Sequence, residues 1–375
     1  MTTSMSEANL INSPVMTPTS ISLHARELDL DVVRGLAILL AMGWHFNGEP
    51  FDIAVVDFFM WPGRVFGWVG VDIFFVLSGF LVGRLVIGEV QKKGCFDAKR
   101  FLMRRAFKLW PILYVFLILM CLMVPWPKFL FQIGLHVQNY LITPVATHLW
   151  SLAVEEHFYL AFALVCLYFA KKNNMMKISF FIVALVPLCL LLRFFAALSN
   201  VDAHVIQIQT QFRIDAIAIG VFLAGLYMYQ PQLFDRINAS KKVLAIIFFV
   251  GAIWLASVDK YSFWGSTLGY TVSLLWGVSI LMLIYRVKFS PKVMGGCRAL
   301  AFMGVYSYAI YIWHVPVIRI VEMVLGRADF TFSRVYVVAS AYVLSIVAGV
   351  IVTKIIERPF LKIRDKVFPS KVGLT

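Results

Sequence analysis

The chain has 375 residues, of which 61% are hydrophobic and 14% are charged, whereas soluble domains carry roughly 25% charged residues. This composition excludes a soluble enzyme and indicates an all-α bundle that crosses a membrane several times. The formal net charge of +14 does not require nucleic acid as a partner, because anionic lipids attract the basic cytoplasmic loops of membrane proteins. We therefore expect membrane lipids among the partners and no nucleic acid.

The N-terminal residues 1–26 are rich in Ser and Thr and lack the basic start and continuous apolar run of a secretory signal. We predict a disordered tail there, a transmembrane domain over residues 27–360 and a basic cytoplasmic tail over residues 361–375. No soluble catalytic domain follows the last predicted span. We therefore expect the membrane domain to act alone.

Apolar runs close to the ~20 residues that cross a bilayer predict about ten transmembrane helices. The runs lie at residues 32–46, 67–88, 109–124, 150–170, 178–198, 212–229, 243–258, 267–285, 299–322 and 335–356. Residues 129–142 are too few and too polar to cross comfortably, and they predict a re-entrant or interface-lying segment.

The distribution of Lys and Arg predicts that both ends of the chain are cytoplasmic. With ten crossings, most of the 34 basic residues fall in cytosolic segments, as the positive-inside rule requires. The outer loops then hold only Arg64, Lys128, Lys260, Arg327 and Arg334. The basic cytosolic loops can also meet an anionic cytosolic donor.

The five cysteines do not have the spacing of metal ligands, and no glycine-rich nucleotide motif occurs. We expect no metal site and no permanently bound cofactor.

The first predicted span carries Arg34 and His45, eleven residues apart. This spacing is about three turns plus ~20°, so both side chains share one face and lie about 16 Å apart along the axis. Asp31 is three residues before Arg34, which permits a helix-surface ion pair. Arg34 either snorkels to the inner headgroups or serves the site. His45 is either interfacial or catalytic.

The next two predicted spans add polar candidates. Asp72, near the outer boundary, either faces water or is functional, and we predict that Gly70, Ser78 and Gly79 permit close helix packing. Arg104 and Arg105 enter the third span. They are either positive-inside anchors or ligands for phosphate.

The sequence WSLAVEEHFYL, residues 150–160, places carboxylates at the head of an apolar span. Ser151, Glu155 and Tyr159 recur every four residues and line one face, whereas Glu156 points about 100° away. A carboxylate on an interior face suits acid or base chemistry, or a buried ion pair that orders the bundle. Later spans add Arg213 and Asp215 near an outer end, and Tyr311 and His314 on one face.

Seven motifs can be read in chain order: LDLDVVRGLAILLAMGWH, GVDIFFVLSGFLVGRL, RRAFKLWPILY, HLWSLAVEEHFYL, FRIDAIAIGVFLAG, YSYAIYIWHVPV and ERPF. In this order they resemble the acyltransferase 3 family, ten-helix membrane acyltransferases that O-acylate cell-surface glycans. The resemblance covers residues 27–360.

The resemblance implies transfer of an acyl group, commonly acetyl, from cytosolic acetyl-CoA to a sugar hydroxyl outside the bacterial inner membrane. It also implies roles for five residues. Arg34, Arg104 and Arg105 would hold donor phosphates, and His45 would act as general base or transient acyl acceptor. Glu155 would orient or charge a partner. The acceptor would be lipopolysaccharide O-antigen, exopolysaccharide, a lipid-linked saccharide or a secreted small molecule. The remaining candidates for contact with donor or acceptor are Asp31, Asp72, Ser151, Glu156, Arg213, Asp215, Tyr311 and His314.

Three of the motifs depart from the family pattern. The usual Asp-Gly-Leu-Arg reads Asp31 to Arg34 with two valines between them, His157 replaces a glutamine, and Lys108 stands where arginine is common. Lysine keeps the charge but loses the bidentate fork.

Two other classes of function fit the intramembrane Glu, His and Arg residues. A transporter would use them as a proton or substrate path and move its solute unmodified, whereas an acyltransferase consumes acyl-CoA. A structural scaffold would tolerate their loss.

Overall fold

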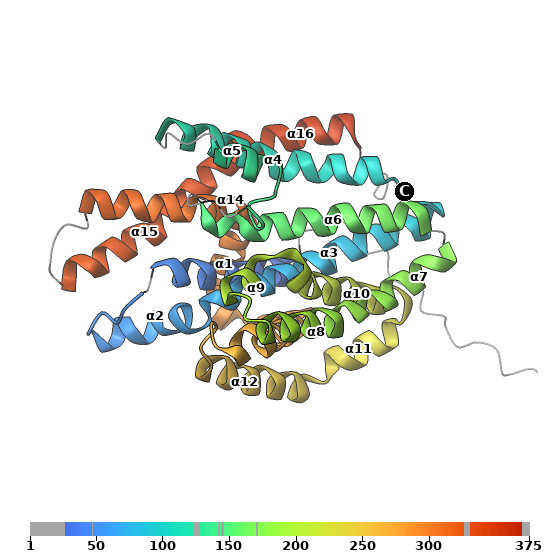
Figure 1. Ribbon diagram of the computed structural model, residues 1–375, viewed down its shortest axis with the longest axis horizontal. Coiled ribbons are helices and arrows are strands. Elements are labelled where there is room, and N and C mark those ends of the chain that lie inside the picture. The colour runs from blue at the N-terminus through green and yellow to red at the C-terminus, as the bar shows by residue number, and fades with distance from the viewer. Residues whose placement is uncertain are drawn as a thin grey trace, which may run out of the picture.

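The computed structural model describes residues 27–46, 48–123, 128–141, 143, 146–169, 172–325 and 331–369, and these residues form helices and connecting turns without a strand (Figure 1). The predicted tail of residues 1–26 lies outside the described residues. The all-α architecture expected from the composition is confirmed.

The α-helices are α1 (Leu28–Phe46), α2 (Ala54–Phe66), α3 (Gly70–Lys93), α4 (Ala98–Met123), α5 (Lys128–Gly134), α6 (Trp150–Phe169), α7 (Lys172–Phe181), α8 (Leu185–Leu198), α9 (Ala203–Ile208), α10 (Asp215–Tyr229), α11 (Pro231–Ala239), α12 (Lys241–Ser257), α13 (Tyr270–Ile284), α14 (Pro291–Leu325), α15 (Thr331–Val352) and α16 (Arg358–Val367). Short 3-10 or π turns join or extend them: η1 (Gly67–Val69), η2 (Thr147–Leu149), η3 (Ile182–Ala184), η4 (Thr210–Phe212), η5 (Gly265–Gly269) and η6 (Thr353–Glu357).

Each predicted span overlaps a helix of the structure. Within the described residues, seven helical stretches are long and apolar enough to cross a membrane, or eight if α10 and α11, bent by 116°, form one broken span. The count omits α1, which carries Asp29, Asp31 and Arg34 in 19 residues, and α12, which has 17 residues. The chain is thus a multi-pass membrane protein, while ten crossings and two cytoplasmic ends stay predictions.

The helix α3 packs in the middle of the bundle against α10, α1 and α13. A Cβ on Gly79 would overlap the carbonyl of Ile217, and one on Gly220 would overlap the carbonyl of Val76. The two backbones therefore approach as closely as glycine allows, which confirms the packing role predicted for Gly79. Ser78 has a further contact, because its hydroxyl is hydrogen-bonded to Tyr159 of α6; its packing role stays a prediction.

The helix α1 lies against α14 on one side and α3 on another, in the lower and middle parts of Figure 1. Its contact with α14 is also glycine-mediated, because a Cβ on Gly304 would overlap the carbonyl of Asp31. Tight packing on two sides fixes the rotation of α1, and this rotation decides where its polar stripe points.

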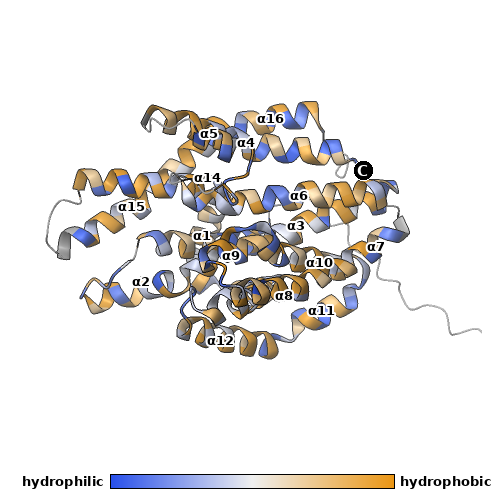
Figure 2. Ribbon diagram, viewed as in Figure 1, coloured by the Kyte–Doolittle hydropathy of each residue, from blue (hydrophilic) through white to orange (hydrophobic). Residues whose placement is uncertain are grey.

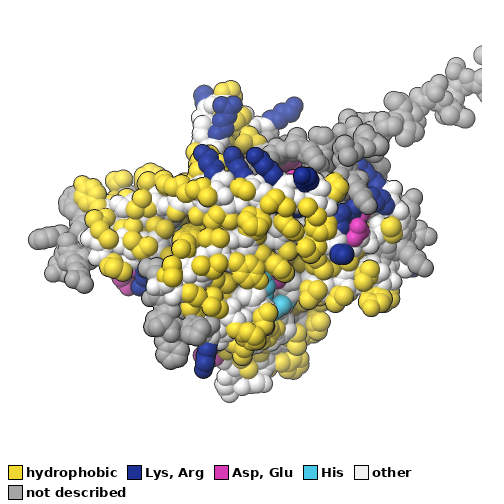
Figure 3. Space-filling view, turned by 90° about the horizontal axis from the view of Figure 1, so that it is seen from above, with side chains coloured by type: hydrophobic (Ala, Val, Ile, Leu, Met, Phe, Trp, Pro, Cys, Tyr) yellow, Lys and Arg dark blue, Asp and Glu magenta, His cyan; other side chains and the backbone are white. Residues whose placement is uncertain are grey.

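Hydrophobic residues occupy much of most helices (Figure 2), and the face of the molecule in Figure 3 is largely apolar. Large side chains such as Leu122, Phe195 and Ile253 are exposed, as expected for helices that face lipid. Figure 3 shows Lys and Arg side chains gathered at the border of this apolar face. Charged groups therefore lie at the border of the apolar face, and others, such as Arg193 and Arg213, are buried inside the bundle.

Of the segment 129–142, residue 142 lies outside the described residues, and the remainder forms the short helix α5 followed by turns. The Nε2 of Gln138 donates to the carbonyl of Leu149 at 2.8 Å, and Nδ2 of Asn139 donates to the Thr210 hydroxyl at 2.8 Å. These buried bonds attach the segment to the bundle. Whether it enters the bilayer or lies at its interface stays a prediction.

Candidate functional site: two cavities and a tyrosine between them

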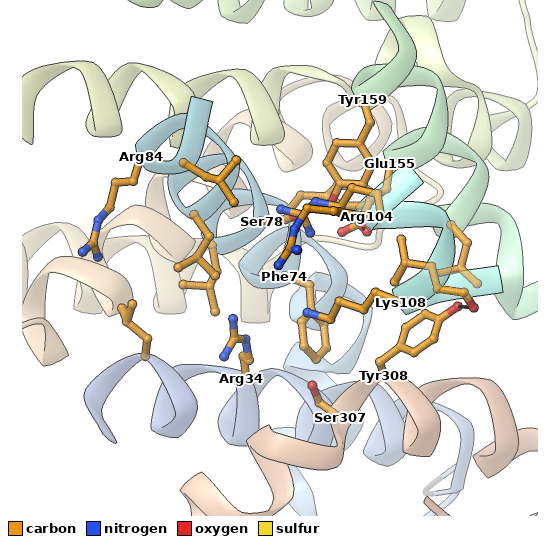
Figure 4. Close-up of a pocket in the computed structure, with 18 of the residues that line it drawn as sticks. Arg34, Phe74, Ser78, Arg84, Arg104, Lys108, Glu155, Tyr159, Ser307 and Tyr308 are labelled. Carbon is orange, nitrogen blue, oxygen red and sulfur yellow. Dashed lines mark hydrogen bonds between the residues drawn. The ribbon is translucent and has the colours of Figure 1, made fainter. Parts of the chain in front are cut away.

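A large cavity of about 530 Å³ lies among α1, α3, α4, α6 and α14. Figure 4 shows Arg34 of α1 reaching toward the same space as Arg104 and Lys108 of α4. Its wall also contains apolar and hydroxyl side chains, among them Phe74 and Tyr308. The cavity thus combines a concentration of cations with an apolar passage.

Most arginines of this cavity are already paired with carboxylates. Arg34 Nη1 donates to Asp31 at 2.5 Å, which confirms the ion pair that their spacing permits. Arg84 forms a bidentate pair with Glu27 at 2.9 and 3.0 Å. Each pair leaves the guanidinium oriented, with part of its charge neutralised.

Arg104 and Arg105 have different surroundings, although both were predicted to be positive-inside anchors or ligands for phosphate. Arg104 contacts α16, through the carboxylate of Asp365 at 3.1 Å and the carbonyl of Phe368. Arg105 lies over the ring of Tyr159 at 5.0 Å, and neither Arg105 nor Lys108 forms an ion pair among the described residues. Arg105 and Lys108 are thus the cavity's best-placed cations for an incoming anion.

The face of α6 predicted from the four-residue spacing is confirmed. Ser151, Glu155 and Tyr159 all line the large cavity, and the Tyr159 hydroxyl donates to Glu155 at 3.2 Å. The Ser78 hydroxyl, on α3, is hydrogen-bonded to the Tyr159 oxygen. Glu156 lines neither described cavity, so its predicted contact with donor or acceptor has no geometric support.

A small cavity of about 150 Å³ lies beyond the large one. It is lined by His45 from α1, His148 from η2 and Lys260 from the loop after α12, together with His204 and Gln207 of α9. Aromatic rings complete its wall: Trp44, Trp68, Trp150, Tyr261 and Tyr311. The cavity therefore offers hydrogen-bonding side chains between flat apolar faces.

Three histidine rings form a cluster next to this cavity. His45 and His148 line it, whereas His314 lines neither cavity, so its predicted contact with donor or acceptor has no direct geometric support. The centroid of His45 lies 5.0 Å from that of His314 and 6.1 Å from that of His148, and the last two are 5.1 Å apart. The described residues include no group of His, Cys, Asp or Glu arranged to hold a metal ion.

Hydrogen bonds to backbone carbonyls assign the tautomers of two of these rings. His314 donates through Nδ1 to the Tyr311 carbonyl at 2.6 Å, and His148 donates through Nε2 to the Ile312 carbonyl at 3.2 Å. Their other ring nitrogens, Nε2 of His314 and Nδ1 of His148, are buried and have no hydrogen-bond partner among the described residues. In a neutral imidazole these nitrogens are acceptors.

Tyr311 of α14 belongs to the walls of both cavities, as does Val71 of α3. The Tyr311 hydroxyl donates to the carbonyl of His148 and lies 2.8 Å from Oγ of Ser151. Because α1 brings Arg34 to the large cavity and His45 to the small one, the predicted stripe joins the two spaces on either side of this tyrosine.

Three other sequence candidates lie apart from both cavities. Arg213 Nη2 donates to Asp72 at 2.5 Å, and Asp72 also accepts from the Ser273 hydroxyl at 2.7 Å. Asp215 pairs with the buried Arg193 at 2.8 Å. Asp72, Arg213 and Asp215 were predicted to contact donor or substrate; the structure instead places their charges in buried pairs that join helices of the bundle.

Sequence reasoning missed several residues of these sites. Arg84 had a signal, because an arginine inside an apolar run is costly unless it is used. His148 stands two residues before Trp150 of the α6 motif and was equally visible. Lys260 had no local signal, because only the tertiary fold brings its loop over His45.

Comparison with known proteins supports one family. A family model described as an acyltransferase domain matches residues 27–354. The chain is 26% identical, over 92% of its length and 59% of the relative's, to O-acetyltransferase OatA of Staphylococcus aureus. It is 23% identical to peptidoglycan O-acetyltransferase OatA of Listeria monocytogenes, over 79% of the chain and 50% of the relative.

A putative O-acetyltransferase of Staphylococcus aureus is 25% identical, over 89% of the chain and 57% of that relative. The chain thus spans little more than half the length of the curated relatives that it matches. No solved structure matches it.

Proposed function

The chain belongs to the acyltransferase 3 family, and from this premise we propose that it is a membrane O-acyltransferase that moves an acetyl group from cytosolic acetyl-CoA to a hydroxyl of a glycan outside a bacterial inner membrane. The observation that carries the proposal is the path along α1, from Arg34 in the basic cavity to His45 in the histidine-rich one. Tyr311 stands between them.

The large cavity suits the donor. Coenzyme A carries several phosphate charges, which require cations, and a long narrow arm, which requires a mostly apolar passage. Arg105 and Lys108, which form no ion pair among the described residues, would bind phosphate oxygens. The thioester would then point toward Tyr311 and the small cavity.

The small cavity suits the acceptor and the proton transfer. The acceptor hydroxyl oxygen would attack the thioester carbonyl carbon while His45 takes the hydroxyl proton. The C–S bond breaks, an ester C–O bond forms, and coenzyme A leaves as a thiolate that regains a proton. In a two-step alternative, His45 itself accepts the acetyl group first and then passes it to the hydroxyl.

Glu155 would act from the donor side. It lines the large cavity and is held by Tyr159, which in turn is held by Ser78. A carboxylate in this position would orient the donor or balance the charge of Arg105 as the thiolate leaves.

The names of the relatives narrow the group to acetyl and add peptidoglycan to O-antigen, exopolysaccharide and lipid-linked saccharides as acceptors. Mass spectrometry of surface glycans from wild-type and deletion cells tests the proposal directly. We expect one class of saccharide to lose one acetyl mass in the deletion strain. A transporter would leave every glycan mass unchanged.

The residue test uses His45→Ala in proteoliposomes supplied with radiolabelled acetyl-CoA. We expect transfer to fall by at least about a hundredfold, because a positioned base contributes roughly that factor. His136→Asn is the control, because His136 lines neither cavity and asparagine tolerates its positive φ. Full activity of His45→Ala at normal abundance would contradict the assignment.

A further inference from the structure

The small cavity contains a cation that the transfer chemistry does not use. Lys260 is 7% exposed and lies in the loop between α12 and η5, which places it among the predicted outer loops. Its ammonium is 4.0 Å from the ring centroid of Trp44 and 4.4 Å from that of Tyr261. These aromatic faces hold the ammonium without neutralising it.

No carboxylate within the described part of the chain pairs with Lys260. Its neighbour Asp259 is exposed, lies outside the cavity wall and accepts the backbone N–H of Tyr261 at 2.7 Å. Burial lowers the pKa of Lys260 to about 8, so Lys260 is protonated in most molecules at pH 7. An almost buried cation without a counter-ion indicates that a ligand supplies the anion.

The rest of the wall has the chemistry of a saccharide site. No Asp or Glu is among the described residues that line the small cavity. The Oε1 of Gln207 and Nδ1 of His148 are buried there without hydrogen-bond partners, so both are acceptors for sugar hydroxyls. The indole rings of Trp44, Trp68 and Trp150 add apolar surface to the wall, which suits the C–H groups of a sugar.

We propose that Lys260 binds a carboxylate of the acceptor saccharide, so that the sugar whose hydroxyl meets His45 is acidic. This inference rests on the proposed acyltransferase function and specifies its acceptor. The cavity, at about 150 Å³, is smaller than the roughly 300 Å³ of a full ligand pocket, so it takes one sugar ring and not a chain. One cation matches one carboxylate better than a multiply charged phosphate.

The alternative is a purely structural role, in which Lys260 only holds its loop against Trp44; we call this the strut role. A strut would affect every acceptor equally, whereas a carboxylate ligand affects only acidic ones. The test must therefore compare charged and neutral forms of one saccharide.

The experiment measures equilibrium binding to the full chain in lipid nanodiscs. The probes are radiolabelled β-glucuronyl-N-acetylglucosamine, its uronate methyl ester and the corresponding glucose 6-phosphate disaccharide. We expect the free acid to bind wild type at least about tenfold more tightly than the ester, as a charge-assisted hydrogen bond provides. Lys260→Met should abolish this preference without changing ester binding, and Lys260→Arg should keep it.

The matched control is Lys242→Met, which removes an exposed lysine at the other end of α12. Equal binding of acid and ester by wild type, or no binding of either, would overturn the inference. Equal loss of both ligands in Lys260→Met would establish the strut role instead. Tighter binding of the phosphate than of the acid would overturn the choice of carboxylate.

A transfer assay on the same samples separates this inference from the proposed function. Selective binding of the acid without any acetyl transfer would support the Lys260 site and contradict the acyltransferase role. Transfer at equal rates to the acid and the ester would support the acyltransferase role and contradict the Lys260 site.

Discussion

The hydroxyl of Tyr311 lies 2.8 Å from Oγ of Ser151, which joins α14 to α6 where the two cavities meet. The same hydroxyl donates to the carbonyl of His148. One side chain therefore fixes both the wall between the two cavities and the backbone that carries His148 of the small cavity.

We expect Tyr311→Phe to lower acetyl transfer by at least about tenfold. The substitution leaves the buried His148 carbonyl without its donor, which costs about 1–3 kcal/mol and displaces the histidine. Donor affinity should change little. Ser151→Ala is the matched variant, because it removes one hydrogen bond of Tyr311 and leaves the other; it should cost less. Equal losses in the two variants would show that the bond to His148 is unimportant.

The two adjacent glutamates of α6 should differ in importance. Glu155→Gln removes the charge from a side chain that lines the large cavity and accepts from Tyr159, whereas Glu156→Gln alters a residue outside both cavities. We expect the larger loss of transfer for Glu155→Gln, measured as kcat/KM for acetyl-CoA at equal protein abundance. The reverse order would mean that Glu156 is the functional carboxylate.

The basic residues of α4 should separate in donor binding. Titration calorimetry with a non-hydrolysable acetyl-CoA thioether measures this directly. We expect Arg105→Gln and Lys108→Gln each to weaken binding by about tenfold or more, since each removes a charge-assisted hydrogen bond. Lys108→Arg should retain binding.

Arg104→Gln is the contrasting variant, because Arg104 is already engaged with α16 through Asp365. We expect it to lower the Tm more than the donor affinity. A loss of donor affinity as large as that of Arg105→Gln would contradict the separation.

Binding of an acidic saccharide should weaken as the pH rises from 7 to 9. The pKa of Lys260 is lowered to about 8, chiefly by burial; Asp259 opposes this shift and Arg213 adds to it. The cation is therefore present below about pH 8 and lost above it. The neutral methyl ester should bind equally at both pH values. In Lys260→Arg the acid should keep its affinity at pH 9, because arginine stays charged; if that affinity falls as in wild type, another group of the cavity is titrating, such as His45, His204 or Tyr261.

Helical periodicity predicted those parts of the site that depend on one helix. A fixed rotation per residue places Arg34 and His45 on one face of α1 and brings Tyr311 close to His314. The same rotation places Ser151, Glu155 and Tyr159 on one face of α6. The structure confirms each of these relationships. Local geometry needs no knowledge of the neighbouring helices.

The partner of each polar side chain depends on tertiary packing, which the sequence pattern does not predict. Nothing in the sequence distinguishes Arg104 from Arg105, yet α16 lies beside one and not the other. Asp72 and Arg213 are 141 residues apart, and a polar residue in a span has the same signature whether it meets a substrate or another helix. Lys260 is in a loop, whose path periodicity does not describe.

The buried pair of Asp72 and Arg213 also constrains how the protein is made. The ribosome delivers α3 to the membrane long before it has synthesised Arg213, so Asp72 waits there without its partner. Breaking such a pair costs about 3–5 kcal/mol, which favours holding α3 near the insertion machinery until α10 arrives. A chain that ends before α10 lacks Arg213 and leaves the Asp72 carboxylate without that partner.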